Sequence, residues 1–520
     1  ALAWWRLARA ICPRVSEAIS MNVSKILSKL AALKYHQSAI IYNDQQFTYG
    51  ELNDIANSLA AYLVDKGIGK KDALAVILPN CPEFAFIYFA ATKIGAIFTP
   101  IDNKLGENEI NSILQDTRAK VCFVYPGLKQ IERLRPQVME VNIAGNQFKS
   151  IVQSAQTASD ITADIDPADT ALYLHTSGTT GRAKIVELSY ENLNCFPEAM
   201  KDCVVQGEKE ILGIILPMSH ISGPIILNLL LANSCKLVII DSINPVSLFE
   251  NIAKHRITYF HAVPPIFSLM LKSGFSERYD TTSLDLIAMM GTSVPVSLMN
   301  AFKKAFPHVI VLQGYGLTET SPLITLTKRA DADDKRASIG TPVQGAEVKV
   351  VDENDEQLHT GEIGELVVKG PMVMKGYLGI ADQDNERFKN GYFHTSDLVK
   401  LDNDNYFYHM GRRDDLVVLA NGQNIYPAEI KNIIFSHPAV LDSEVIGVYS
   451  EKVRGNVLQA FVVPAQMGTL SDNEVRSLCQ NELGSAKTPK YVTMLESIPK
   501  TSTGKANIQE LRNLSKYNDR

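Results

Sequence analysis

The sequence predicts an α/β fold in which helices alternate with short buried strands. Runs of apolar and β-branched residues at 73–80, 96–101 and 120–125 predict strands, and apolar residues at helical spacing predict a helix over 81–95. The alternation returns in three further strand-like runs, at 210–217, 236–241 and 259–264. Alternation of this kind favours parallel strands joined by helices.

The segment before the first of these strands is predicted to be largely helical, from 26 to 63. Thr48 is a candidate N-cap, and Glu51, three residues later, completes a capping box. Gly67 fits a helix stop, because glycine accepts the left-handed conformation that ends many helices.

The pattern changes after Ser338. Short strands separated by Gly and Asp turns at 346–357, 361–370 and 404–423 predict an antiparallel region. The last hundred residues return to mixed helix and strand. The charged segment 411–415, Gly-Arg-Arg-Asp-Asp, is the best candidate for a hinge before a small terminal domain.

Composition limits the class of protein. The chain has 520 residues, of which 46% are apolar and 21% charged, and this balance fits a globular chain with a sizeable core. The 51 basic and 57 acidic residues give a net charge of −6, which provides no overall attraction to nucleic acid. No uninterrupted apolar run reaches the ~18 residues expected of a membrane-spanning helix.

The seven cysteines are odd in number and scattered, and none forms a Cys-x-x-Cys pair. A disulfide scaffold and a thiolate zinc site are therefore not expected, and we expect a reducing, cytoplasmic location. Residues 1–20 differ from the rest, because they hold both tryptophans and three arginines. They are expected to be an extension outside the fold, with a targeting or membrane-surface segment as the alternative.

The most informative stretch runs from Leu172 to Lys184, LYLHTSGTTGRAK. A strand-like run leads into four hydroxyls, two glycines and a lysine: Thr176, Ser177, Gly178, Thr179, Thr180, Gly181 and Lys184. Glycines let backbone N–H groups approach an anion, hydroxyls donate to phosphate oxygens, and lysine adds a charge. The stretch predicts a phosphate-binding loop. It is not a P-loop, because alanine occupies position 183 and isoleucine follows Lys184.

At this point the chain resembles the adenylate-forming superfamily of acyl-CoA synthetases, peptide-synthetase adenylation domains and luciferases, and fatty acyl-CoA synthetases most of all. Six motifs follow the family's order: TSGTTGRAK, LPMSHISG (216–223), QGYGLTET (313–320), GYFHTSDL (391–398), GRRDD (411–415) and PKTSTGK (499–505). The resemblance implies a large N-terminal domain of two α/β subdomains plus a β-barrel-like subdomain, and a small mobile α+β C-terminal domain. The expected boundaries are 1–20 for the extension, 21–411 for the large domain and 412–520 for the small one.

The resemblance implies a two-step reaction. A carboxylate attacks the α-phosphate of ATP to give an acyl-adenylate, and a thiol then displaces AMP. The implied roles are Mg²⁺ binding by Glu319 with Thr179, contact with the α-phosphate by Thr318, and contact with adenine by Tyr315. Asp397 and Arg412 would bind the ribose, and Gly291 would belong to the nucleotide site.

The small domain is implied to move between the two steps. Lys505 would enter the site for adenylation and bridge the substrate carboxylate and the α-phosphate. Asp414 matches the hinge position, and rotation there would bring 420–422 near the path of the thiol. The thiol is expected to be coenzyme A or the phosphopantetheine of a carrier protein, because 420–422, Ala-Asn-Gly, departs from the family's usual double glycine.

The resemblance places His220 in the acyl pocket near the carboxylate, and Met290 would narrow that pocket if it points inward. No acidic residue stands out in 220–224, 289–293 or 313–316, and this disfavours amino acid substrates. A medium- or long-chain fatty acid is therefore the expected substrate. The alternatives are an adenylation enzyme for an aryl or amino acid, a luciferase-type oxidase and a non-catalytic nucleotide sensor. Peripheral membrane contact and the oligomeric state are left open.

Overall fold

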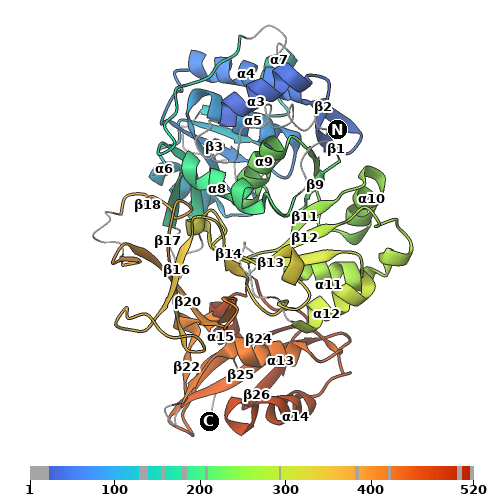
Figure 1. The fold of residues 1–520 in the computed structure, drawn as a ribbon, viewed down its shortest axis with the longest axis vertical. Coiled ribbons are helices and arrows are strands. Elements are labelled where there is room, and N and C mark those ends of the chain that lie inside the picture. The colour runs from blue at the N-terminus through green and yellow to red at the C-terminus, as the bar shows by residue number, and fades with distance from the viewer. Residues whose placement is uncertain are drawn as a thin grey trace.

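The computed structural model describes residues 23–127, 139–153, 159–176, 184–204, 209–291, 294, 296–380, 386–419, 423–500 and 506–515. The predicted α/β class is confirmed: two large mixed sheets with helices are followed by an antiparallel sheet and a smaller C-terminal layer, at the bottom of Figure 1.

The first sheet has seven strands, in the order β18-β8-β7-β4-β3-β5-β6. Its strands are β3 (Ala73–Ile77), β4 (Ile97–Pro100), β5 (Val121–Val124), β6 (Met139–Asn142), β7 (Thr170–Thr176), β8 (Lys184–Ser189) and β18 (Gly376–Tyr377). Strands β3 to β7 pair in parallel, whereas β8 turns back against β7 and β18 pairs antiparallel with β8. The sheet therefore brings Tyr377 beside the strand that leaves the phosphate loop.

The second sheet has nine strands, in the order β15-β14-β13-β12-β11-β9-β10-β1-β2. These are β1 (Ser38–Tyr42), β2 (Gln45–Thr48), β9 (Ile211–Ile214), β10 (Lys236–Ile239), β11 (Tyr259–Ala262), β12 (Leu286–Met289), β13 (Ile310–Tyr315), β14 (Thr325–Leu326) and β15 (Thr341–Pro342). From β1 to β13 the neighbouring strands are parallel.

The helices of the two sheets pack into three cores, the largest of which is formed with α3, α4, α5, α7, α8 and α9. They are α3 (Val23–Lys34), α4 (Tyr49–Asp65), α5 (Pro82–Ile94), α6 (Glu107–Asp116), α7 (Asn146–Gln153), α8 (Tyr190–Met200), α9 (Ser222–Asn233), α10 (Pro245–His255), α11 (Pro264–Ser273) and α12 (Val296–Ala305). Helices α5 and α9 are apolar around almost their whole circumference, which fits their burial inside that core.

The expectation of a helix over 26–63 is corrected in part. Helices α3 and α4 do form, and Thr48 caps α4 through the predicted capping box with Glu51. The backbone φ of Gly67 is +74°, as a helix stop requires. Between the helices, however, β1 and β2 form a hairpin, because β1 pairs with β10 about two hundred residues later.

The antiparallel region predicted after Ser338 is confirmed as a five-stranded sheet. It contains β16 (Glu347–Val351), β17 (Ile363–Lys369), β19 (Phe388–Lys389), β20 (Tyr392–Leu401) and β21 (Phe407–Arg412). Strands β20 and β21 are long neighbours, and β21 leads directly into the predicted hinge.

The C-terminal part has cores of its own. It contains β22 (Val417–Val418), β23 (Asn424–Ile425), α13 (Pro427–Phe435), β24 (Val440–Ser450), β25 (Gly455–Pro464), α14 (Asp472–Leu483), β26 (Tyr491–Met494) and α15 (Ile508–Leu514). Two apolar clusters are built entirely from residues beyond Val417. A separate core is the usual mark of a unit that can move as a body.

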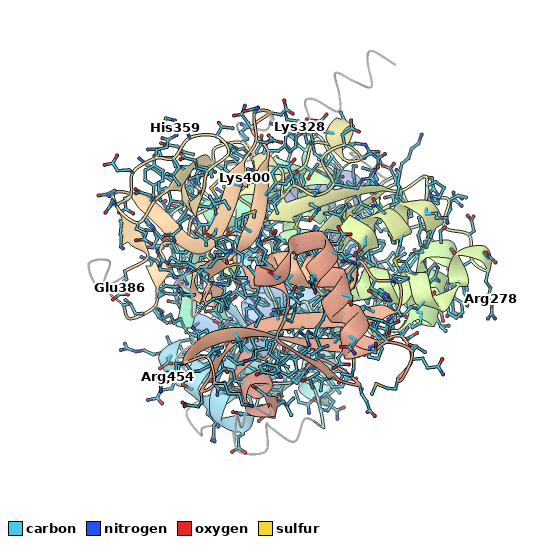
Figure 2. The ribbon with its side chains drawn as sticks, turned by 90° about the horizontal axis from the view of Figure 1, so that it is seen from below. Arg278, Lys328, His359, Glu386, Lys400 and Arg454 are labelled. Carbon is cyan, nitrogen blue, oxygen red and sulfur yellow. The ribbon has the colours of Figure 1, made fainter. Side chains whose placement is uncertain are left out.

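Among the described residues, no helix has the length and apolar character needed to cross a bilayer. Figure 2, seen from the C-terminal end, shows the labelled charged residues Arg278 and Glu386 at opposite margins of the molecule.

Candidate active site

The candidate site residues lie where parallel strands end. Thr176 ends β7, Tyr315 ends β13, and Gly291 follows β12 by one residue. His220 follows β9, and Asp102 follows β4. In α/β sheets, ligands bind beyond the carboxyl ends of the strands. These residues follow strands of both large sheets, and the contact of Asp102 with His220 joins the two sets.

One group of residues surrounds Asp397. The backbones of Asp397 on β20 and Arg412 on β21 are cross-strand partners, so their side chains share a face. The Tyr315 hydroxyl donates to Asp397 Oδ2 at 2.6 Å, and His409 Nε2 lies 3.4 Å from Oδ1. Arg412 Nε is 3.9 Å from Oδ1. Strand β13 and the consecutive strands β20 and β21 therefore meet at one carboxylate.

The Asp397 carboxylate is 4% exposed and yet is held ionised. Burial alone would raise its pKa, but the hydrogen bond and charge of His409, the charge of Arg412 and the Tyr315 hydroxyl together hold the pKa below its usual value. A buried, charged carboxylate with two oxygens suits a vicinal diol such as the ribose of a nucleotide.

A second group surrounds Tyr377. Its hydroxyl donates to Glu319 Oε1 at 2.8 Å, and the Lys184 ammonium lies 4.9 Å from the centre of its ring. The backbone N–H of Met374 donates to the Glu319 carbonyl at 2.8 Å, which fixes the turn that carries Glu319. Tyr377 thus holds together the end of the phosphate loop and the carboxylate expected to bind Mg²⁺.

Arg412 connects the two groups. Burial raises the pKa of both Tyr315 and Tyr377, and the charge of Arg412 opposes the rise in each. The charge of Arg412 therefore acts on one tyrosine hydroxyl of each group.

A third group contains His220, Asp102 and His175. His220 Nε2 lies 3.9 Å from Asp102 Oδ2, and the Asp102 carboxylate is 2% exposed. His175 is the residue before Thr176, and its Nδ1 atom is buried without a hydrogen-bond partner. Burial, with the charge of His220, lowers the pKa of His175 to about 4. The His175 imidazole is therefore neutral at physiological pH.

Met290 packs against the end of β13. A Cβ added to Gly314 would come within 3.3 Å of Met290 Cε, so the Met290 side chain lies across Gly314. Gly291 has a φ of +90°, which glycine adopts readily, and its open side faces Val263.

The predicted hinge residue Asp414 is exposed, in a short 3₁₀ helix, Arg413–Asp415. Its neighbour Arg413 donates to Glu365 Oε2 at 2.9 Å, and Glu365 is buried on β17. His394 Nδ1 lies 3.2 Å from the same oxygen. Thr318 begins the 3₁₀ helix Thr318–Thr320, which carries Glu319.

Several predicted residues lie outside the part of the chain that the structure describes. These are Ser177, Gly178, Thr179, Thr180 and Gly181 of the phosphate loop, Lys505, and the segment 420–422. Their roles stay predictions.

The sequence analysis missed Tyr377, His409, Asp102 and His175. Asp102 and His175 had a usable signal, because each directly follows or ends a predicted strand, as the chosen site residues do. Tyr377 had none, because its position depends on the pairing of β18 with β8, about 190 residues earlier.

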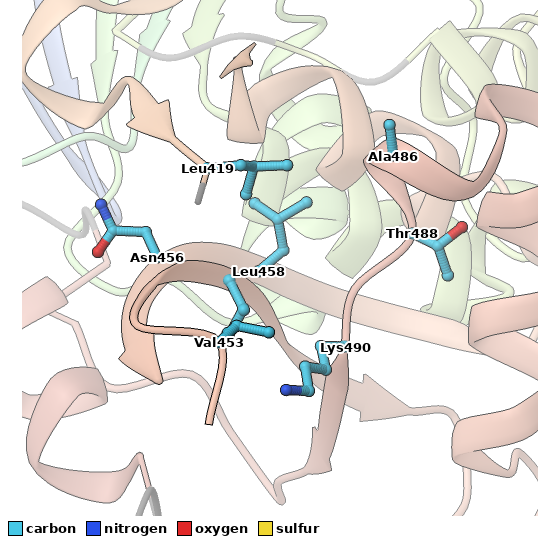
Figure 3. A pocket seen from close by; sticks show the side chains of 8 residues that line it. Leu419, Val453, Asn456, Leu458, Ala486, Thr488 and Lys490 are labelled. Atoms are coloured by element: carbon cyan, nitrogen blue, oxygen red, sulfur yellow. The ribbon is translucent and has the colours of Figure 1, made fainter. Parts of the chain in front are cut away.

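A hollow of about 250 Å³ lies in the C-terminal part (Figure 3). It is lined by Leu419, Val453, Asn456, Val457, Leu458, Ala486, Thr488 and Lys490. Leu419 is the last described residue before 420–422.

Comparisons with known proteins agree with this geometry. A family model described as "AMP-binding enzyme" matches residues 28–378, and one described as "AMP-binding enzyme C-terminal domain" matches residues 429–505. A feruloyl-CoA synthase of Amycolatopsis is 29% identical over 486 residues, 93% of this chain and 96% of that protein. A long-chain-fatty-acid–CoA ligase of Mycobacterium tuberculosis is 29% identical over 492 residues, with the same two coverages.

Among solved structures, the o-succinylbenzoate coenzyme A synthetase of Bacillus subtilis in complex with ATP and magnesium is similar with a TM-score of 0.81. The sequence identity is 27%, and the alignment covers 94% of this chain and 98% of that one. Both of the present chain's parts are therefore represented in its relatives.

Proposed function

The chain belongs to the family of AMP-binding enzymes, and on that premise we propose that it is an acid–CoA ligase whose acid is a medium- or long-chain fatty acid. The acid first reacts with ATP to give an acyl-adenylate and pyrophosphate, and the thiol of coenzyme A then displaces AMP. The observation that carries this proposal is that the predicted nucleotide residues gather in two clusters, Asp397 with Tyr315 and Arg412, and Glu319 with Lys184 at Tyr377.

The ligand roles follow from that arrangement. Asp397 and Arg412 bind the ribose, Tyr315 lies against adenine, and Lys184 with Thr176 faces the phosphates. Thr318 contacts the α-phosphate, and Gly291 lets the backbone approach the nucleotide because no Cβ intervenes. Lys505 supplies the charge that bridges carboxylate and α-phosphate.

Glu319 and Thr179 are the proposed holders of Mg²⁺. Magnesium prefers one or two carboxylates with water and phosphate oxygens, and no group of three potential ligands occurs among the described residues. Since Tyr377 occupies Glu319 Oε1, the second oxygen is the proposed ligand atom. When bound, the ion neutralises phosphate charge.

The apolar Met290 side chain across Gly314, and Val263 on the open side of Gly291, support a hydrophobic acid. The expectation against amino acids rested on the lack of an acidic residue in the predicted pocket segments. Asp102, which those segments did not include, is an acidic residue near His220. Amino and aryl acids therefore belong in the test.

The acceptor is proposed to be coenzyme A rather than a carrier protein. The hollow beside Leu419 carries Lys490 on its lining, and a cation there suits the several phosphates of coenzyme A. We place the boundary between the large and small parts at 411–412, with Asp414 as the hinge.

The location is proposed to be the cytoplasm. The six cysteines in the described residues are all free, five of them buried. Free thiols fit a reducing compartment.

The test is ATP–pyrophosphate exchange with octanoate, dodecanoate, palmitate, benzoate, 4-hydroxycinnamate and phenylalanine. Dodecanoate or palmitate should give the fastest exchange, and coenzyme A should accept the acyl group better than a phosphopantetheinylated carrier protein. Glu319→Gln should slow exchange roughly 10²-fold, whereas Glu356→Gln, an exposed carboxylate, should not. Fastest exchange with an aryl or amino acid would overturn the fatty acid, and absence of exchange with every acid would overturn the function.

A further inference from the structure

A buried carboxylate lies behind His220. Asp102 follows β4, is 2% exposed, and directs Oδ2 toward His220 Nε2 at 3.9 Å. Its other oxygen accepts the backbone N–H of Lys104 at 2.9 Å, so the carboxylate is fixed in place. The 3.9 Å between Asp102 Oδ2 and His220 Nε2 is longer than a hydrogen bond, and contacts of catalytic groups often shorten when the reactants bind.

The position of the carboxylate determines which ring nitrogen of His220 is available. A carboxylate beside Nε2 favours the tautomer in which Nε2 carries the proton, and Nδ1 is then a proton acceptor on the other side of the ring. His220 is partly exposed, with a side chain 26% accessible, so the ring is not enclosed by the core. In this arrangement, the Asp102 carboxylate orients the His220 imidazole so that it can act as a base.

The other charged and titratable groups around His220 keep the ring neutral. Burial lowers the pKa of His220, the Asp102 carboxylate opposes that effect, and Lys104 adds to it. His175 is the other imidazole near it and is itself neutral. A neutral imidazole can take up a proton, and Asp102 would stabilise the imidazolium that results.

We propose that Asp102 is a positioning residue that holds His220 as the general base for the thiol step. This rests on the proposed function and on the predicted position of His220 near the substrate carboxylate, whose carbon the thiol attacks in the second step. The thiol S–H bond breaks and its proton goes to His220 Nδ1. The sulfur electron pair forms the C–S bond, the bond between the carbonyl carbon and the phosphate oxygen breaks, and AMP leaves with that electron pair. The imidazolium then loses its proton to water.

The test separates the two half-reactions. Adenylation is followed by pyrophosphate exchange, and thioester formation by mixing enzyme, the synthetic acyl-adenylate of dodecanoate and coenzyme A in a single turnover. Asp102→Asn retains the acceptor for the Lys104 N–H and removes only the charge. It should slow thioester formation roughly tenfold and adenylation by less than threefold. Asp65→Asn, whose side chain is 72% exposed, is the matched control and should change neither rate.

The pH profile distinguishes positioning from a structural role. The wild-type rate of thioester formation should rise with pH as the His220 ring loses its proton. Asp102→Asn removes a charge that raises the His220 pKa, so that rise should move to lower pH. His220→Ala should lose roughly 10²-fold near neutral pH, and its deficit should shrink at alkaline pH, where the thiol of coenzyme A ionises without a base.

Equal loss of both half-reactions in Asp102→Asn, or an unchanged pH profile, would overturn the inference. So would a deficit in His220→Ala that persists at high pH. Absence of pyrophosphate exchange and of thioester formation in the wild-type enzyme would instead overturn the proposed function, and the inference with it.

Discussion

Asp397 shows how one residue can be prepared for a ligand before the ligand arrives. Tyr315 and His409 already direct polar hydrogens at its two oxygens, and Arg412 lies across the strand pair. These partners offset the free energy cost of burying a charge, so the carboxylate stays ionised.

Asp397→Asn should raise the KM for ATP roughly 10- to 100-fold, because an amide has one acceptor where the carboxylate has two, and hydrogen bonds to a charged group contribute about 1.5–3 kcal/mol. The measurement is the ATP dependence of pyrophosphate exchange. Asp404→Asn is the control, since that side chain is 71% exposed. An unchanged KM would refute the ribose assignment.

Lys490 offers a second test at the residue scale. Lys490→Gln removes the cation from the lining of the hollow and should raise the KM for coenzyme A several-fold without changing the KM for ATP. Lys25→Gln, an exposed lysine on α3, should change neither. If the two KM values rise together, the hollow does not bind the acceptor.

His409 also shows where sequence reasoning fails at this scale. If side chains alternated strictly along β21, those at positions 410 and 408 would share the face of Arg412, and His409 would lie on the opposite face. The register shifts by one residue, however, so that Val399 pairs with His409. This bulge turns His409 to the face of Asp397, and a pattern of alternation cannot reveal a bulge.

At the scale of elements, the short 3₁₀ helix Arg413–Asp415 is where the backbone would turn between the two half-reactions. Asp414→Pro fixes φ at one value and restricts the residue before it. We expect it to slow thioester formation at least tenfold more than adenylation. Asp414→Asn keeps the backbone free and serves as the control. Equal losses in the two assays would argue against rotation at this position.

The elements themselves were predicted best where the signal is local. The cap of α4 and the stop at Gly67 depend on residues within a few positions of each other, and both are present. The hairpin of β1 and β2 was missed because β1 is stabilised by β10, far along the chain. Non-local pairing overrides a local helical pattern.

At the scale of the whole molecule, buried histidines should make the fold sensitive to acid. Burial lowers the pKa of His261 from 6.5 to about 3, and its Nε2 atom has no hydrogen-bond partner. The unfolded chain takes up a proton below pH 6.5 and the folded chain does not. The contribution of His261 to the free energy of unfolding is therefore unaffected above that pH, and the free energy of unfolding falls as the pH drops from 6.5 toward 3.

His261→Leu should reduce that sensitivity, because leucine has a similar volume and cannot take up a proton. The fall in Tm between pH 7.5 and 5.0 should be smaller than in the wild type by about 2 °C. The control is His359→Leu at an exposed position, which should leave the fall unchanged. The same fall in all three proteins would show that His261 does not contribute.

For the candidate site, the sequence predicted the types of residue but not the contacts between them. Short motifs identified Asp397, Glu319 and Lys184, because each lies in a run whose chemistry is visible locally. Tyr377 joins two of them only because β18, β8 and the turn carrying Glu319 meet in space. Such three-way contacts depend on the packing of complete sheets.

The pairing of Asp397 with Arg412 has a consequence for how the nucleotide is kept during turnover. Both residues belong to neighbouring strands that precede Asp414, so backbone hydrogen bonds fix their separation wherever the C-terminal part stands. In the proposed reaction, AMP would stay anchored through its sugar while Lys505 withdraws and the acceptor arrives. The same two side chains would hold the nucleotide in both chemical steps, and the intermediate would not be released to solvent.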